Sequence, residues 1–341
     1  MQTVMRLHIK EAPPPLRERN PKIRQKVADL VMSALAKDPA ARPASAAAFA
    51  SALRANSEGA GTLLRRALVI YSEHLPTFLR TAVVVLSPVI ALNLLQLGNK
   101  VAQRAGLMPE TLGAIVTALI GLLGFIFLLL TTSIISGLTT QQVTQLLITP
   151  LRPIRFRPAI NRLKKRLRHF VFTTLVVDVL FVFGLALCVV PGVLMMMNYA
   201  LVPAVVIMEG KSGRAAMRRS KELTRRARRT VAAIILIQFI VPAFLNGLIS
   251  FFVSTTLAAF KIEAKGMQTI IQEVLFTPFL IFLMSLGAII TALLYVKTRQ
   301  AGGETLKEAL SGFAEEEDDT PRSQWQARIR ERVSMASNRN E

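Results

Sequence analysis

The chain has 341 residues, of which 52% are hydrophobic, and its 42 basic and 21 acidic residues give a formal net charge of +21. A mean hydropathy of +0.44 is too high for an ordinary soluble domain. A basic chain that is also this apolar favours an anionic membrane surface over nucleic acid as its partner. The single cysteine, Cys188, excludes an intrachain disulfide.

Residues 1–55 are predicted to form short helices outside the membrane. A proline cluster at 13–15 precedes one helical pattern over 27–35, and a second pattern follows Pro43. Residues 56–74 are predicted to be a linker followed by a basic juxtamembrane helix. The first 20 residues are charged and proline-rich, so we expect no cleavable signal peptide.

Continuous apolar runs fill the segment 75–296, and they predict an all-α, polytopic membrane protein with about six transmembrane helices. One run is about twice the roughly 20 residues that a single span needs, so we expect two spans joined by a tight turn at Pro191-Gly192. Continuous rather than alternating runs exclude a membrane β-barrel. The runs are 75–97, 112–136, 169–208, 230–253 and 272–296.

The loops between the predicted spans differ in charge. Segments 150–168 and 209–229 are strongly basic, whereas the alternate loops carry few charges. The positive-inside rule therefore places both basic loops and both termini in the cytoplasm of a bacterial inner membrane. Pro191-Gly192 and the 254–270 loop are then outside, and residues 297–341, with an acidic run at 315–319, form a cytoplasmic tail.

The basic loops have two open interpretations, as determinants of orientation or as interfacial helices that bind anionic lipid. Aromatic residues do not alternate with the basic ones, so nucleic acid is not expected as a partner. In the first loop, Ile160, Leu163 and Leu167 fall on one face of 158–168, with basic residues around it. In the second loop a similar mild stripe is formed by Ala216, Ser220, Leu223 and Ala227. The candidate lipid contacts are Arg162, Lys164, Lys165, Arg166, Arg218, Arg219, Arg225 and Arg226.

Asp178 is the one acidic residue deep within a predicted span. Inserting a carboxylate there costs about 2.5–3.5 kcal/mol, so we expect Asp178 to be neutral, hydrogen-bonded to a partner or lining a wet cavity. Two interpretations stay open for it, a hydrogen-bonded structural carboxyl group and a proton or substrate relay. At about 1.5 Å per residue, Asp178 lies roughly 13 Å inside a span entered at His169, and Gln238 lies at matching depth. We therefore predict an Asp178–Gln238 hydrogen bond, with Thr174 and Ser285 as the next candidates.

Residues 1–54 resemble the last fifth of a bacterial (Hanks-type) serine/threonine protein kinase domain. In that family a proline-rich segment precedes the final helices, and a Leu-Ala-Lys-Asp-Pro…Arg-Pro run lies between them. Here the run is residues 35–39 followed by Arg42 and Pro43. The resemblance implies that Arg42 pairs with the glutamate of an Ala-Pro-Glu motif, which this chain lacks. We therefore expect Arg42 to be structural and the short segment to be poorly packed.

The parts of a kinase that hold nucleotide phosphates and metal ions do not occur in this sequence. It has no Gly-rich loop, no strand lysine, no His-Arg-Asp loop and no Asp-Phe-Gly motif. The three histidines are scattered, without metal-binding spacing. We therefore expect no catalytic residues, no cofactor and no metal site, and no enzymatic activity in the chain as given.

The membrane segment resembles the six-span membrane domain found beside glycerophosphodiester phosphodiesterases. The resemblance is carried by Pro191-Gly192, by the run "PAVVIMEGKSGRAAMRRSKELTRR" and by the exit "LLYVKTRQ" at 293–300. Within it, the matching residues are Pro203, Glu209, Ala215, Ser220 and Leu223. The resemblance implies no active-site residues, because the catalytic domain of that family is not in this chain.

Two functions follow from these patterns. In the first, the chain is the C-terminal, membrane-anchoring or regulatory part of a transmembrane serine/threonine kinase, with Met1 an internal start or truncation point. Its partners would be anionic lipid headgroups and a kinase catalytic lobe or a second copy of the chain. In the second, it is a stand-alone, non-enzymatic membrane protein that handles lipid or a small solute through a cavity near Asp178.

Overall fold

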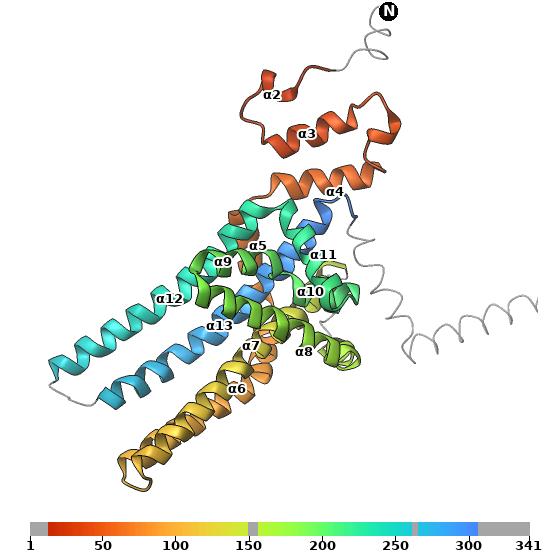
Figure 1. Cartoon of the computed structure of the whole chain (residues 1–341). Helices are drawn as coiled ribbons and strands as arrows, with labels where there is room; N and C mark the ends of the chain where they lie inside the picture. The colour runs from red at the N-terminus through yellow and green to blue at the C-terminus, as the bar shows by residue number, and fades with distance from the viewer. Residues whose placement is uncertain (1–12, 149–155, 261–264, 306–341) are drawn as a thin grey trace, which may run out of the picture. The chain divides into compact units, whose positions relative to one another are not determined.

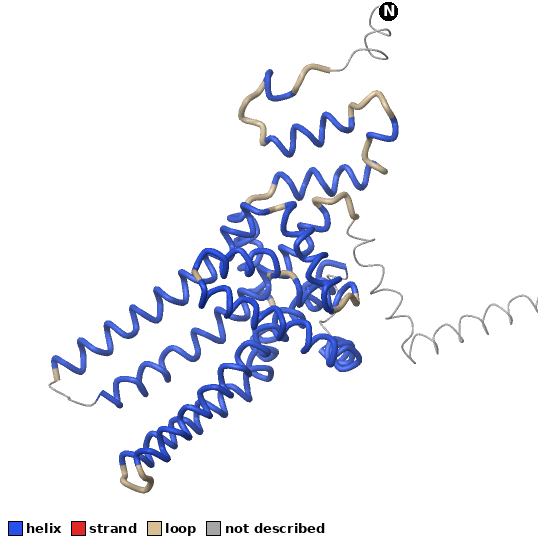
Figure 2. The backbone as a smooth tube through the Cα atoms, in the orientation of Figure 1, coloured by secondary structure: helices blue, strands red, loops and turns tan. Residues whose placement is uncertain are grey.

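A computed structural model describes residues 13–148, 156–260 and 265–305, and every regular element within them is a helix (Figure 2). The chain divides into two compact units, one of Glu58–Thr298 and one of Met1–Ser57 with Arg299–Glu341. The division falls before the predicted juxtamembrane helix, which therefore belongs to the membrane unit. The acidic run at 315–319 lies outside the described residues.

The N-terminal unit contains four short helices in its described part. They are α2 (Leu16–Arg19), α3 (Gln25–Ala34), the 3-10 helix η1 (Pro39–Ala41) and α4 (Ala46–Ser57). Among the described residues of this unit, the fully buried apolar side chains are Ala28, Ala48, Ala52 and Ala55. Alanine buries little apolar area, and Leu35 remains 49% exposed, so this unit has a thin core.

The described part of the membrane unit, Glu58–Thr298, contains nine helices, of which α13 ends just beyond the unit. They are α5 (Ala60–Glu73), α6 (Leu75–Arg104), α7 (Glu110–Ile148), α8 (Phe156–Leu187), α9 (Val189–Tyr199), α10 (Val202–Glu209), α11 (Gly213–Arg226), α12 (Arg228–Ala259) and α13 (Lys265–Gln300).

Six segments of the described chain are long and apolar enough to cross a membrane. Their surfaces carry large exposed apolar side chains, such as Phe244 at 70% and Leu94 at 63% exposure. Such surfaces are unfavourable in water and suit contact with lipid, where apolar side chains need no burial. The predicted class, an all-α polytopic membrane protein, is confirmed.

The structure corrects the path of the chain around the predicted tight turn. Helix α8 ends at Leu187 and the chain turns at Cys188, whose backbone is extended. Pro191 and Gly192 instead lie in the first turn of α9, where a proline is tolerated because its missing N–H would have no helical partner. The fourth apolar segment, Val190–Glu209, is also broken at Ala200-Leu201 into α9 and α10.

Helices α6 and α7 lie side by side along most of their length (Figure 1). Helices α12 and α13 run alongside each other and are linked by hydrogen bonds from Gln238 to Gly287 and from Gln272 to Asn246. A core forms where α6, α7 and α13 meet, from Ala82, Leu86 and Val89 with Ile135 and Ala288. The short helix α10 is almost wholly buried between α7, α8 and α11.

Candidate functional site

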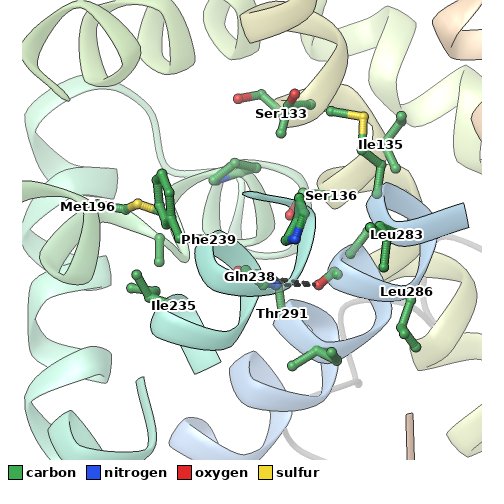
Figure 3. A pocket seen from close by; sticks show the side chains of 18 of the residues that line it. Ser133, Ile135, Ser136, Met196, Ile235, Gln238, Phe239, Leu283, Leu286 and Thr291 are labelled. Atoms are coloured by element: carbon green, nitrogen blue, oxygen red, sulfur yellow. Dashed lines mark hydrogen bonds between the residues drawn. The ribbon is translucent and has the colours of Figure 1, made fainter. Parts of the chain in front are cut away.

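The membrane unit contains a half-open cavity of about 640 Å³, lined by residues of α5, α7, α8, α9, α10, α12 and α13. Figure 3 shows part of its lining, including Met196, Phe239 and Leu283 around the polar side chains of Ser133 and Gln238. The lining is mainly apolar. Its polar residues are Thr132, Ser133, Ser136, Thr174, Asp178, Tyr199, Gln238 and Thr291.

Helical spacing brings the polar residues to the cavity. On α8, Thr174, Asp178 and Phe181 follow each other four and three residues apart, so they share one face. On α7, Ser133 and Ser136 are three apart and face the same space. Ser133, Ser136, Thr174 and Asp178 thus present polar atoms to the cavity.

Asp178 has weak support within its own chain. The hydroxyl of Ser133 donates to Oδ2 of Asp178 at 3.5 Å, at the long limit of a hydrogen bond. Among the described residues, no lysine, arginine or histidine forms an ion pair with this carboxyl group. The hydroxyl of Ser136, on the same wall, is buried without a hydrogen-bond partner in the described part of the chain. The cavity therefore contains polar atoms that its own residues do not satisfy.

The predicted hydrogen bond between Asp178 and Gln238 is wrong, although both residues line the cavity. The side-chain amide of Gln238 donates instead to the carbonyl oxygen of Gly287 at 3.0 Å and to the hydroxyl of Thr291 at 3.4 Å (Figure 3). Gly287 has no side chain to keep the amide away, since an added Cβ would lie 3.2 Å from Nε2. Counting residues along a span predicts depth but not which neighbouring backbone is accessible.

The two alternative partners predicted for Asp178 bond to their own helices. The hydroxyl of Thr174 donates to the carbonyl of Phe170, and that of Ser285 donates to the carbonyl of Ile281. Pro242, in α12, also lines the cavity. Because proline has no N–H, the backbone carbonyl of Gln238, four residues earlier, receives no helical hydrogen bond from it.

A second polar centre holds α10, α11 and α13 together. Glu209, with a side chain only 9% exposed, accepts hydrogen bonds from Lys211 Nζ at 2.9 Å, Arg219 Nε at 3.1 Å and the hydroxyl of Tyr295 at 3.3 Å. Gly210 follows in the left-handed conformation that ends α10. The carboxylate of Glu209 thus joins three helices at one end of the bundle.

The stripe of Ala216, Ser220, Leu223 and Ala227 is buried, whereas in the stripe of the first loop Leu163 is buried and Leu167 is exposed. The hydroxyl of Ser220 also donates to the carbonyl of Asn198 in α9 at 2.8 Å. Two of the residues that carried the membrane-domain resemblance, Ser220 and Leu223, therefore pack α11 against the bundle. A third, Ala215, is exposed.

The candidate lipid contacts fall into two groups. Three are turned to the protein, because Arg166 donates to the carbonyl of Ile207, Arg219 binds Glu209 and Arg226 donates to the carbonyl of Thr298. The candidates on the exposed surface are Lys164, Lys165, Arg218 and Arg225. The side chain of the eighth, Arg162, lies outside the described residues.

Sequence reasoning missed two members of the exposed face of α11. Arg214 and Lys221 are exposed, and with Arg218 and Arg225 they fall at intervals of four, three and four residues. That spacing aligns all four on one side of the helix. The same spacing in the sequence could have identified them.

Arg42, for which the kinase resemblance implies a glutamate partner, uses a backbone acceptor instead. Its Nε donates to the carbonyl of Ala36 at 2.8 Å. The side chain of the preceding Asp38 accepts a hydrogen bond from the backbone N–H of Ala40, at the start of η1.

In the parts of the chain that the structure describes, no three His, Cys, Asp or Glu side chains are grouped to hold a metal ion. His8 lies outside those parts.

Comparison with known proteins gives no relative for this chain: no family model, curated protein or solved structure matches it. Both family resemblances therefore remain predictions from short motifs.

We predict that Glu209→Ala lowers the free energy of unfolding by about 2–3 kcal/mol, since it removes the partly buried carboxylate that accepts hydrogen bonds from Arg219 and Tyr295. Glu222→Ala is the matched control, because Glu222 is 53% exposed and its contact with Arg219 is 3.9 Å long. Its loss should cost less than about 1 kcal/mol. Equilibrium unfolding in mixed micelles would compare the two, and equal losses would contradict the role given to Glu209.

Proposed function

We propose that the membrane unit binds an amphiphilic molecule in its cavity, as a non-enzymatic membrane protein that handles lipid or a small solute. The observation that supports this function best is a mainly apolar cavity of about 640 Å³ with an acidic residue on its wall. Ligand sites typically have this size, with a few polar groups that orient the ligand in an apolar pocket.

The polar atoms of the cavity favour a ligand whose polar end donates hydrogen bonds. A carboxylate only accepts, and the donor that reaches Asp178 from its own chain is a distant serine hydroxyl. An ammonium or hydroxyl group on the ligand would replace water at this carboxyl group. An anionic headgroup would be repelled, because two negative charges in an apolar cavity cannot both be compensated. The alkyl part would contact side chains such as Phe181, Phe239 and Leu283.

Three amphiphiles of equal chain length test this preference. We expect dodecylamine to raise the thermal midpoint of the protein in nanodiscs most, dodecanol less and dodecanoic acid least, because a ligand stabilises the state that binds it. In Asp178→Asn the advantage of the amine should disappear. Glu273→Gln is the matched control, because Glu273 is an exposed carboxylate on α13 that does not line the cavity.

An identical effect of the three amphiphiles would contradict the proposed ligand chemistry. So would an amine preference that Asp178→Asn leaves unchanged, or one that Glu273→Gln removes equally.

A second function is favoured by the N-terminal unit, as the end of a transmembrane serine/threonine kinase that the membrane unit anchors or regulates. The motif at residues 35–39 with Arg42-Pro43 forms a short, ordered turn between α3 and α4. The unit buries mainly alanine and leaves Leu35 half exposed. A thin core with exposed leucine is what the last helices of a lobe would show without the lobe that covers them.

This second function predicts the size of the protein in the cells that make it. An antibody raised against residues 13–57 should detect a membrane protein clearly larger than the 37.5 kDa of this chain. The 341-residue chain itself should show no saturable binding of ATP. A single band at the mass of the chain would contradict kinase anchoring and leave the ligand-binding proposal unaffected.

The exposed face of α11 supports a membrane surface as partner, with both termini and α11 on the cytoplasmic side of a bacterial inner membrane. Arg214, Arg218, Lys221 and Arg225 point away from the buried stripe of the same helix. Near an anionic surface each such charge contributes about 1 kcal/mol of attraction. Anionic headgroups of the cytoplasmic leaflet are the corresponding ligands.

Neutralising three of these charges tests the lipid contact. Replacing phosphatidylcholine by phosphatidylglycerol in nanodiscs should raise the thermal midpoint of the wild-type protein but not that of Arg218→Gln/Lys221→Gln/Arg225→Gln. Arg19→Gln/Lys22→Gln/Arg54→Gln removes the same charge from exposed positions of the N-terminal unit and should keep the response. If both triple variants respond alike, net charge rather than α11 determines the effect.

A further inference from the structure

We infer that α8 and α9 form a re-entrant hairpin, which enters the membrane from the side of α11 and returns to that side. The cavity then lies in the half of the bilayer nearest to α11. The four helices that cross the membrane are α6, α7, α12 and α13, and both termini remain on one side.

Both arms of the hairpin are attached to α11. The backbone N–H of Gly213, the first residue of α11, donates to the hydroxyl of Thr173 in α8 at 2.9 Å. The hydroxyl of Ser220, in the middle of α11, donates to the carbonyl of Asn198 in α9 at 2.8 Å. These two hydrogen bonds place Thr173 and Asn198 at the depth of α11.

Helix α11 cannot lie in the hydrocarbon. Its 14 residues include six arginines and lysines, and each would cost several kcal/mol at the centre of a membrane. The helix is strongly amphipathic, with one buried face and one basic face, as helices at a membrane interface are. Thr173 and Asn198 therefore lie at the membrane boundary.

From that boundary the hairpin is too short to reach the other side. The 11 residues of α9 rise about 16 Å in total, and α8 continues for about 20 Å beyond Thr173. The hydrocarbon core of a bilayer is about 30 Å thick and needs about 20 helical residues. Helices α6, α7, α12 and α13 have 30, 39, 32 and 36 residues and meet this requirement.

The composition of the hairpin tip gives independent support. Residues 185–194 contain no charged residue, and Leu187, Val190 and Leu194 are 68%, 64% and 53% exposed there. The turns that join α6 to α7 and α12 to α13 have charges in the sequence, at Lys100 and Glu110 around the first and at Lys261 and Glu263 in the second. A turn placed in water would have no reason to expose only apolar side chains.

The backbone of the tip is also suited to a position in the hydrocarbon, where unpaired polar groups are costly. The N–H of Cys188 donates to the carbonyl of Gly184, and the N–H of Gly192 donates to the carbonyl of Cys188. Gly192 packs closely on α8, because an added Cβ would lie 2.9 Å from the Cα of Leu185. Small residues allow such close approach of helices in membranes.

This path sets the depth of the cavity. Asp178 is five residues beyond Thr173, which places it about 8 Å inside the boundary rather than the roughly 13 Å counted from His169. A ligand of the cavity would therefore come from the leaflet on the α11 side. This last step rests on the proposed ligand binding, whereas the path of the hairpin does not.

The single cysteine of the protein lies at the tip and is exposed, so the wild-type chain carries its own probe. We expect a membrane-impermeant maleimide to leave Cys188 unlabelled both in intact cells and in inside-out vesicles, and to label it after unfolding in SDS. Two reference variants in a Cys188→Ala background calibrate the two sides. Leu107→Cys, 78% exposed at the α6–α7 turn, should be labelled from one side, and Ser212→Cys, preceding α11, from the other.

Labelling of Cys188 from the same side as Leu107→Cys would overturn the re-entrant path and support two full spans. Labelling from the side of Ser212→Cys would place the hairpin outside the membrane and overturn it equally. Neither result depends on whether the cavity binds an amphiphile, so the failure of this inference and that of the proposed function are distinguishable.

Discussion

The attachment of the basic helix α11 to the ends of the apolar helices determines the depth of the rest of the membrane unit. Six cationic side chains keep α11 out of the hydrocarbon, while its buried face and Ser220 hold it against the bundle. Glu209 connects the same helix to α10 and α13 through Arg219 and Tyr295. Any residue bonded to α11 is thereby placed at the membrane boundary, and the position of the cavity follows from that boundary.

The polar groups near α11 and those at the cavity differ in how well the protein satisfies their hydrogen bonds. Near α11, partly buried charges are compensated by several donors, as at Glu209. At the cavity, Asp178 has one long hydrogen bond and Ser136 has none in the described residues. A fully satisfied polar cluster stabilises a fold, whereas unsatisfied groups around an empty space are available to a ligand. This contrast is the reason to assign binding to the cavity and structure to Glu209.

The sequence was sufficient to predict the helical class and the apolar segments, and to identify the stripe of small and apolar residues on α11, because these depend on run length and helical period. It also drew attention to Asp178, since one carboxyl group in an apolar run is conspicuous. It could not predict that Gln238 bonds Gly287, because that contact depends on a missing side chain in another helix. The turn at Cys188 and the break at Ala200 were not predicted either. Pro191-Gly192 is a strong turn signal, but proline is equally compatible with the first turn of a helix.

The central claim, that α11 limits how deeply the α8–α9 hairpin enters the membrane, is tested most directly by the depth of its tip. A nitroxide spin label on Cys188, in protein reconstituted into bilayers, reports depth through its collisions with oxygen and with a water-soluble nickel complex. The structure predicts high oxygen and low nickel collision rates, at about 15–20 Å from the boundary on the α11 side. A label at the opposite headgroup level, accessible to nickel, would contradict the account.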